Sequence, residues 1–95
     1  MEIVKKRNKE KCWDILSFFI SGREIGSASI EIHRKEVFIW NIESYERGAG
    51  TKMINYIKSL KGIATIKGDV GNESHIFWEK MGAEIKGDEF AIRCE

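Results

Sequence analysis

Residues 37–51 read Val-Phe-Ile-Trp-Asn-Ile-Glu-Ser-Tyr-Glu-Arg-Gly-Ala-Gly-Thr, and this stretch decides the fold. Its first part, residues 37–42, is a nearly continuous apolar run, which is typical of a central β-strand covered on both faces. Its last part holds two glycines just before an amphipathic segment that begins near Gly50. Glycine lets the backbone approach an anion closely, and the first amides of a helix favour negative charge. A Gly-x-Gly pair also occurs in simple tight turns, so the prediction of an anion-binding turn depends on the elements around it.

Two further strands are expected before this stretch. Residues 11–20 are rich in aromatic and β-branched side chains, and residues 25–33 alternate between apolar and polar ones, both of which are typical of strands. Short polar turns, Ser21-Gly22 and Arg34-Lys35, are expected to join the strands. The sequence thus predicts three antiparallel strands ahead of the glycine turn.

Helices and strands alternate after the turn. Apolar residues recur at helical spacing from Met53 to Leu60, so a helix is expected from about residue 50 to 61, with Gly62 ending it. Because a helix intervenes, a strand at residues 63–67 should run parallel to the strand at 37–42. A second helix and a closing hairpin are then expected, at residues 75–81 and at 83–85 with 90–94.

Length and composition describe one small folded domain. The chain has 95 residues, of which 42% are hydrophobic and 33% charged, so we expect a single domain over residues 1–95. The formal net charge of +1 gives no general attraction to nucleic acid. A basic cluster near the N-terminus is expected to be a solvated face or a hairpin turn, and consists of Lys5, Lys6, Arg7, Lys9 and Lys11.

Cysteine usage and hydropathy indicate the compartment. Cys12 and Cys94 are too few for a disulfide framework and fit no metal-ligand spacing, so we expect a reducing cytoplasm and no metal site. No segment approaches the roughly 20 apolar residues that a membrane-spanning helix needs. We therefore expect a cytoplasmic protein that folds alone or as a small oligomer such as a homodimer.

The order of elements resembles that of the GNAT superfamily of acyl-CoA-dependent N-acetyltransferases. The resemblance covers roughly residues 25–83 and is carried by residues 42–50, Ile-Glu-Ser-Tyr-Glu-Arg-Gly-Ala-Gly, and residues 76–83, Ile-Phe-Trp-Glu-Lys-Met-Gly-Ala. It implies an α/β (α+β) fold with a mixed, mostly antiparallel sheet, a splayed central parallel strand pair and two main helices. The pantetheine arm of acetyl-CoA, the implied cosubstrate, would lie in the splay.

The resemblance also assigns residues to the cofactor. Backbone amides of the glycine turn would bind the diphosphate, while main-chain groups of Trp40 and Ile42 would meet the pantetheine and the thioester carbonyl. The second helix would contribute Asn72 and Trp78. The implied turn residues are Arg47, Gly48, Ala49, Gly50, Thr51 and Lys52.

The chain departs from the family pattern at several positions. Lys52 stands where the family usually has a small residue, and Asn72 is displaced by one position, since Gly71 occupies the expected place. Trp78 replaces the tyrosine that usually protonates the departing thiolate, and an indole cannot act as that acid. The helical segment that ordinarily separates the first two strands is missing, with only Ser21-Gly22 in its place.

Three residues are candidates for the general base. Glu36 lines up with the strand glutamate that histone-type members use for this purpose. His33 has a suitable titration range, and Glu43 directly follows the proposed oxyanion-binding residue Ile42. Each of them is equally compatible with an ordinary solvated position on a strand, as is Glu31.

The resemblance implies transfer of acetyl from acetyl-CoA to a primary amine, by direct attack. The acceptor is expected to be a lysine of a protein or peptide, because a link as short as Ser21-Gly22 leaves no lid to enclose a small amine. Trp78 and the missing segment favour an alternative, a GNAT-derived module that binds CoA or another protein with little or no turnover. A nucleic-acid binder using the basic cluster is the least favoured interpretation.

Overall fold

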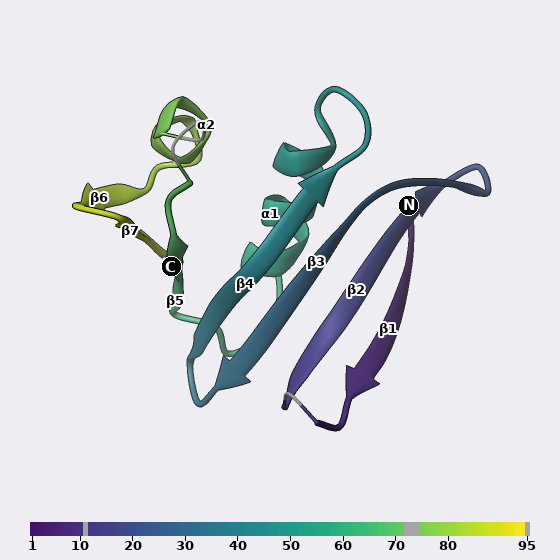
Figure 1. Cartoon of the computed structure of the whole chain (residues 1–95), viewed down its shortest axis with the longest axis horizontal. Coiled ribbons are helices and arrows are strands. Elements are labelled where there is room, and N and C mark those ends of the chain that lie inside the picture. Colours follow the sequence, from purple (N-terminus) through teal and green to yellow (C-terminus); the bar gives the residue numbers. More distant parts are fainter. Residues whose placement is uncertain (11, 72–74, 95) are drawn as a thin grey trace.

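The first four strands of the chain form an antiparallel meander (Figure 1). The computed structural model describes residues 1–10, 12–71 and 75–94. The strands are β1 (Glu2–Asn8), β2 (Trp13–Ile20), β3 (Arg23–His33) and β4 (Glu36–Ser44).

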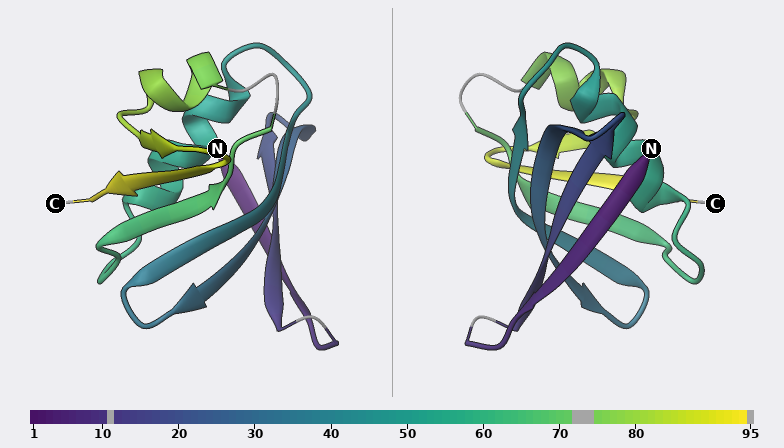
Figure 2. Two further views of the ribbon diagram at one scale, coloured as in Figure 1. Left: turned by 60° about the vertical axis from the view of Figure 1, so that its left-hand side comes forward. Right: turned by 90° about the vertical axis from the view of Figure 1, so that its right-hand side faces the viewer.

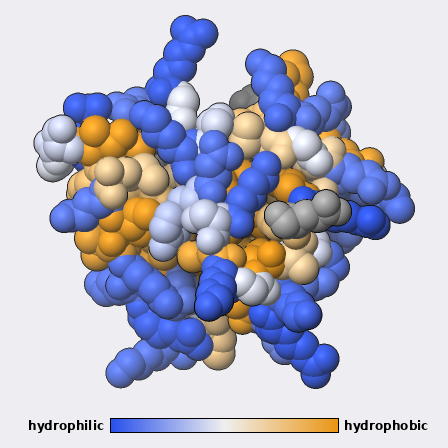
Figure 3. All heavy atoms as spheres, turned by 180° about the vertical axis from the view of Figure 1, so that it is seen from behind, coloured by the Kyte–Doolittle hydropathy of each residue, from blue (hydrophilic) through white to orange (hydrophobic). Residues whose placement is uncertain are grey.

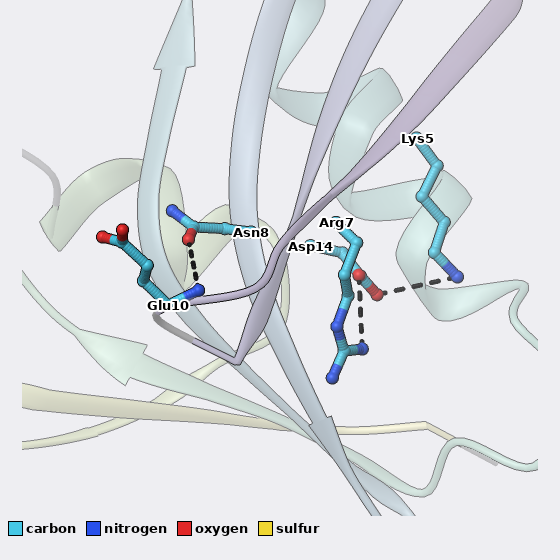
Figure 4. A network of polar contacts seen from close by, with 5 residues as sticks. All are labelled: Lys5, Arg7, Asn8, Glu10 and Asp14. Atoms are coloured by element: carbon cyan, nitrogen blue, oxygen red, sulfur yellow. Dashed lines mark hydrogen bonds and ion pairs between the residues drawn. The ribbon is translucent and has the colours of Figure 1, made fainter.

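The prediction of three strands before the glycine turn was wrong, because β1 adds a fourth. On the face that β1 turns toward the core, Lys5 and Arg7 lie opposite Leu16 and Asp14 of β2. Both basic side chains approach the Asp14 carboxylate, at 3.6 Å from Lys5 and 3.5 Å from Arg7 (Figure 4). Asp14 is only 4% exposed, so charge pairing rather than apolar alternation holds this part of β1.

The second half of the chain alternates helices and strands. It consists of α1 (Ala49–Lys58), β5 (Thr65–Asp69), α2 (His75–Lys80), β6 (Glu84–Lys86) and β7 (Glu89–Arg93). The helix α1 ends at Lys58, earlier than expected, since the Ser59 hydroxyl donates to the Tyr56 carbonyl at 2.6 Å. Otherwise each element occupies its expected place to within a few residues.

The seven strands of the described residues join one sheet in the order β1-β2-β3-β4-β5-β7-β6. The pair β4–β5 is parallel and lies at the centre, and the remaining neighbours are antiparallel. The predicted α/β (α+β) fold class, a mostly antiparallel sheet with one central parallel pair and two helices, is therefore confirmed.

The helix α1 covers one face of the sheet, and the core lies between them (Figure 2). Seen from behind, this side shows hydrophilic side chains around its rim with apolar atoms between them (Figure 3). The buried apolar side chains are Leu16, Phe18, Ile25, Ala28, Ile30, Val37, Ile39, Ala49, Met53, Ile54, Ile57, Ile66, Val70, Trp78, Phe90 and Ile92.

The opposite face of β1 to β4, here called the open face, is not covered by a helix of the described chain (Figures 1 and 2). The expectation that β4 is buried on both faces was therefore wrong: Val37 and Ile39 face the core, whereas Trp40 is 50% exposed. The expected position of β4 at the centre of the sheet is confirmed.

The helical segment that usually separates the first two strands of the family is missing here, but not at the link that was expected. Ser21-Gly22 joins the second and third strands, whereas the first two strands are joined by residues 9–12. This link is also short. A link too short to form a lid was the basis for expecting an uncovered acceptor side. Such a link is present, but at residues 9–12 instead of Ser21-Gly22.

Candidate active site

The strands β4 and β5 separate partway along their length. Their parallel ladder runs from Glu36–Thr65 to Ile39–Gly68 and then stops, while β4 continues to Ser44. The cause lies on the other edge of β4, where Ile30 pairs with Ile39 but Ser29 pairs with Asn41. Trp40 is thus the extra residue of a β-bulge, and bulges bend and twist a strand.

The separation creates a cleft of ≈ 430 Å³. The far half of β4 forms one wall, the end of β5 forms the second and α2 closes the third. The lining residues are Ile39, Trp40, Asn41, Ile42, Ser44, Gly50, Asp69, Val70, Gly71, Phe77, Trp78 and Phe90.

The glycine turn leads into α1 at the edge of this cleft. Gly48 is the N-cap residue, with φ of 85° and ψ of −9°, and no side chain in the described part of the chain caps the helix. The first turn of α1 carries no acidic residue. Two of the predicted amides are already engaged, because Ala49 donates to the Glu46 carbonyl and Lys52 to the Gly48 carbonyl, both at 3.2 Å. The other predicted amides of the turn, at Gly48, Gly50 and Thr51, remain the candidate donors to an anion at this helix start.

An ion pair braces the segment before the turn. The Arg23 guanidinium donates to the Glu46 carboxylate at 2.9 and 3.2 Å, and the Ser44 hydroxyl donates to the Glu46 carbonyl at 2.7 Å. The Tyr45 amide donates to the Ile25 carbonyl of β3 at 2.9 Å. The turn is therefore fixed to β3 on its approach to Gly48.

Comparison with known proteins identifies the architecture. The sequence matches no protein-family model and no curated protein. Among solved structures, the fold is similar to Tetrahymena GCN5, with a TM-score of 0.76 and 13% identity over 90% of this chain and 70% of that chain. It is also similar to the ribosomal-protein-S18-alanine N-acetyltransferase from Escherichia coli, with a TM-score of 0.74 and 16% identity over 90% and 71% of the two chains.

A third similar structure is a Bacillus subtilis acetyltransferase in complex with CoA. Its TM-score is 0.71, at 16% identity over 97% of this chain and 96% of that chain. The chain has the GNAT fold. The splayed strand pair expected from the resemblance is therefore present, together with the glycine turn at the start of α1.

The wall that α2 contributes to the GNAT cleft is aromatic. Trp78 is 2% exposed and stacks on Phe90 of β7, with ring centroids 3.6 Å apart and an interplanar angle of 14°. Phe77 meets Trp78 edge to face, at 4.9 Å. Trp78 thus lines the cleft as expected, but contributes no titratable proton. Asn72 lies outside the described residues.

Packing against Phe77 explains why one of the two glycines of the turn, Gly50, has no side chain. A Cβ atom on Gly50 would lie 2.9 Å from the Phe77 ring, so the absence of a side chain lets α2 pack against the start of α1. At Gly48, in contrast, a Cβ atom would meet nothing within 4 Å, and the positive φ is what favours glycine. The basic candidates beside them, Arg47 and Lys52, are exposed, as is Thr51, whereas Ala49 is buried in the core.

Glu43 is held by a chain of polar side chains. Its carboxylate accepts hydrogen bonds from the Asn41 amide at 3.2 Å and from the Tyr45 hydroxyl at 3.3 Å. The Tyr45 hydroxyl also lies 3.2 Å from the Ser27 hydroxyl of β3. Sequence reasoning missed this network, although the spacing of residues 41, 43 and 45 places them on the same side of an extended segment.

Glu36 and His33 lie together at the other end of β4. They pair across the β3–β4 hairpin, and both are exposed. The Glu36 carboxylate makes an ion pair with Lys67 at 3.0 Å and lines a second depression of ≈ 640 Å³, not the cleft. The Glu31 carboxylate accepts a hydrogen bond from the Trp40 indole at 3.0 Å. Of the three predicted base residues, Glu43 is the one beside the cleft walls.

The remaining titratable groups point to no further centre. Within residues 1–10, 12–71 and 75–94, no cluster of three or more His, Cys, Asp and Glu side chains could hold a metal ion. Burial raises the pKa of the Cys94 thiol, and the nearby Lys58 opposes this effect. In the same residues no helix is long and apolar enough to span a bilayer.

Proposed function

We propose that the chain binds acetyl-CoA in the cleft between β4 and β5 and transfers the acetyl group to a primary amine. The observation that carries this proposal is the splay itself, a bulged central strand whose far half faces an uncapped helix start. The similar Bacillus subtilis acetyltransferase, which was solved in complex with CoA, supports the same use of the fold.

The groups around the cleft fit the parts of this cosubstrate. The first amides of α1 suit the diphosphate, with Arg47 and Lys52 exposed nearby as counter-charges. The Tyr45 amide points toward β3. Since backbone groups alternate along an extended strand, the amides of Ser44 and Ile42 face the cleft, where an extended pantetheine chain can pair with them.

Bound acetyl-CoA would supply a thioester that an unprotonated amine can attack directly. The main-chain amides of β4 at Trp40 and Ile42 are the candidate donors to the developing oxyanion, and one fixed donor of this kind is worth about 3 kcal/mol. Glu43 is the favoured group to receive the amine and its proton, because Asn41 and Tyr45 hold its carboxylate next to the cleft. Glu36 and His33 are second choices, since they lie at the other end of β4, whereas the neighbours of Glu43 on both sides line the cleft.

The favoured acceptor is a lysine of a protein or peptide. A small amine requires an enclosing pocket, whereas here β4, which forms one wall of the cleft, belongs to a sheet whose other face no helix of the described chain covers. Among the similar structures, the Escherichia coli enzyme is named for a ribosomal protein that it acetylates, so a protein acceptor is compatible with this fold.

A second candidate function, a CoA-binding module with little or no turnover, is favoured by one observation. The α2 position that usually carries the acid holds the buried indole of Trp78, so water or another group would have to protonate the departing thiolate. Binding without turnover would leave the cleft and the glycine turn intact.

Calorimetry and mass spectrometry test both candidates. We expect CoA and acetyl-CoA to bind with one-to-one stoichiometry. Lysine peptides incubated with acetyl-CoA should gain about 42 Da for each acetyl group that replaces one hydrogen of an amine. CoA binding without a gain in peptide mass would favour the CoA-binding module over the acetyltransferase. The absence of CoA binding would refute both candidates.

A further inference from the structure

A partly exposed aromatic surface lies on the open face beside the cleft. It consists of Trp13 from β2 with Phe38 and Trp40 from β4, here called the aromatic patch. The ring centroids of Trp13 and Trp40 are 5.4 Å apart, and those of Phe38 and Trp40 are 4.7 Å apart. The rings of Trp13 and Trp40 meet above β3, where the Glu31 carboxylate accepts the Trp40 indole hydrogen bond.

The aromatic patch is continuous with the cleft. Trp40 belongs to both, because the bulge that opens the cleft also turns its half-exposed ring onto the open face. A molecule that covers the patch therefore passes the mouth of the cleft. Such a molecule must be larger than a simple amine, since it spans three strands.

The charged residues around the aromatic patch indicate which kind of ligand it can bind. Glu31, Glu43 and Asp69 lie on or beside the open face near the cleft, and none of them makes an ion pair in the described part of the chain. These unneutralised carboxylates disfavour nucleic acid and favour a cationic ligand. A two-fold dimer centred on the patch would bring the surrounding carboxylates of both copies into one interface, and repulsion between like charges disfavours a second copy of the chain.

We infer that the aromatic patch docks the acceptor, a polypeptide segment in which apolar or aromatic side chains flank the lysine that enters the cleft. This inference rests on the proposed function. Aromatic side chains at the centre of an interface contribute a large share of its binding energy, while the surrounding carboxylates orient the basic residue.

Peptide kinetics test the inference. The probes are two blocked heptapeptides with a central lysine, flanked by leucines in one and by serines in the other, together with α-N-acetyl-lysine amide as a small acceptor. We expect a kcat/KM for the leucine peptide that is on the order of tenfold higher than for the serine peptide. Trp13→Ala should remove this preference through KM and leave turnover of the small acceptor unchanged.

Ile32→Ala is the matched control, because Ile32 is 45% exposed but belongs to the core-facing side of β3, outside the patch. It should retain the preference. If Trp13→Ala does not fold, Trp13→Leu carries the same test. Equal rates on both peptides, or an unchanged preference in the Trp13 variants, would overturn the inference.

Indole NMR signals separate this inference from the proposed function. CoA should shift the Trp78 signal, since Trp78 lines the cleft, and the leucine peptide should shift the Trp13 signal, since Trp13 does not. An unmoved Trp78 signal with CoA refutes the proposed function. An unmoved Trp13 signal with the peptide refutes the docking surface. A wild-type dimer that Trp13→Ala converts to a monomer would assign the patch to a second copy and overturn the inference too.

Discussion

Two glycines that look alike in the sequence have different physical roles. Gly48 has a positive φ with open space around it, whereas Gly50 leaves room for the Phe77 ring. A sequence pattern reports glycine at both positions and cannot distinguish backbone conformation from packing. Substitution at Gly50 therefore perturbs the contact between α1 and α2, and Gly48 is the position that tests anion binding.

We expect Gly48→Ala to weaken CoA binding at least tenfold. A Cβ atom at a positive φ costs about 1–2 kcal/mol and shifts the amides that face the anion. Gly62→Ala is a matched control, because Gly62 has the same φ of 85° and the same open space, but follows α1 instead of preceding it. Both variants should lose similar stability in urea, and only Gly48→Ala should lose affinity in calorimetry. Equal CoA affinity in the two variants would show that the anion does not bind at the glycine turn.

The role of Trp78 can be tested with two smaller rings. Trp78→Tyr and Trp78→Phe should each lose about 1–3 kcal/mol of unfolding free energy, because both vacate part of the stack on Phe90. If a missing acid limits turnover, Trp78→Tyr should acetylate lysine peptides at the wild-type rate or faster, and clearly faster than Trp78→Phe. Identical rates for the two variants would show that the hydroxyl reaches no reacting atom.

At the scale of elements, the sequence predicted the helices and strands whose apolar residues recur at the spacing of a buried face. It missed the features that depend on ion pairs or on the register of a partner strand. The helices, the parallel pair and the closing hairpin were predicted because their apolar faces meet one core. β1 was missed because Lys5 and Arg7 occupy its core-facing positions and pair with Asp14. The bulge at Trp40 was missed because register depends on the partner strand, which no local pattern encodes.

Loss of the charges on β1 should destabilise the sheet. The double variant Lys5→Ala with Arg7→Ala leaves the buried Asp14 carboxylate without its cations. We expect a loss of about 1–3 kcal/mol of unfolding free energy, limited by the solvent exposure of the two cations. Lys6→Ala is the control, since Lys6 pairs with Ile15 on the other face. Urea denaturation measures the difference, and equal effects of the two changes would contradict the assigned role of Asp14.

At the scale of the whole molecule, the sequence predicted one mixed sheet and its resemblance to the GNAT superfamily implied a cleft at the centre, but neither indicated which face stays open. The candidate base residues also required the fold, because Glu36, His33 and Glu43 all lie on or next to β4, and only the side of the bulge on which each one lies separates them. A continuous apolar run indicated burial on two sides. Without a helix of the described chain over β4, Trp40 is half exposed instead.

Acetyl-CoA should stabilise the folded chain by mass action. At a ligand concentration of one hundred times Kd the gain is about 2.7 kcal/mol, which raises Tm by about 10–20 °C in a domain of this size. Differential scanning fluorimetry measures this shift. Gly48→Ala should reduce it, and an unchanged Tm at saturating acetyl-CoA would argue against binding to the native state.

The terminal strand β1 has an outer edge without a strand partner in the described chain. Free edges invite pairing with other chains, and lysine is a common guard against such association. In this protein the charged residues of the edge strand have a second role, because Lys5 and Arg7 also form ion pairs with Asp14. Substituting them therefore affects more than the edge. Resistance to aggregation and the docking of β1 therefore depend on the same two side chains, and a variant that loses them should form fibrils as well as unfold more easily.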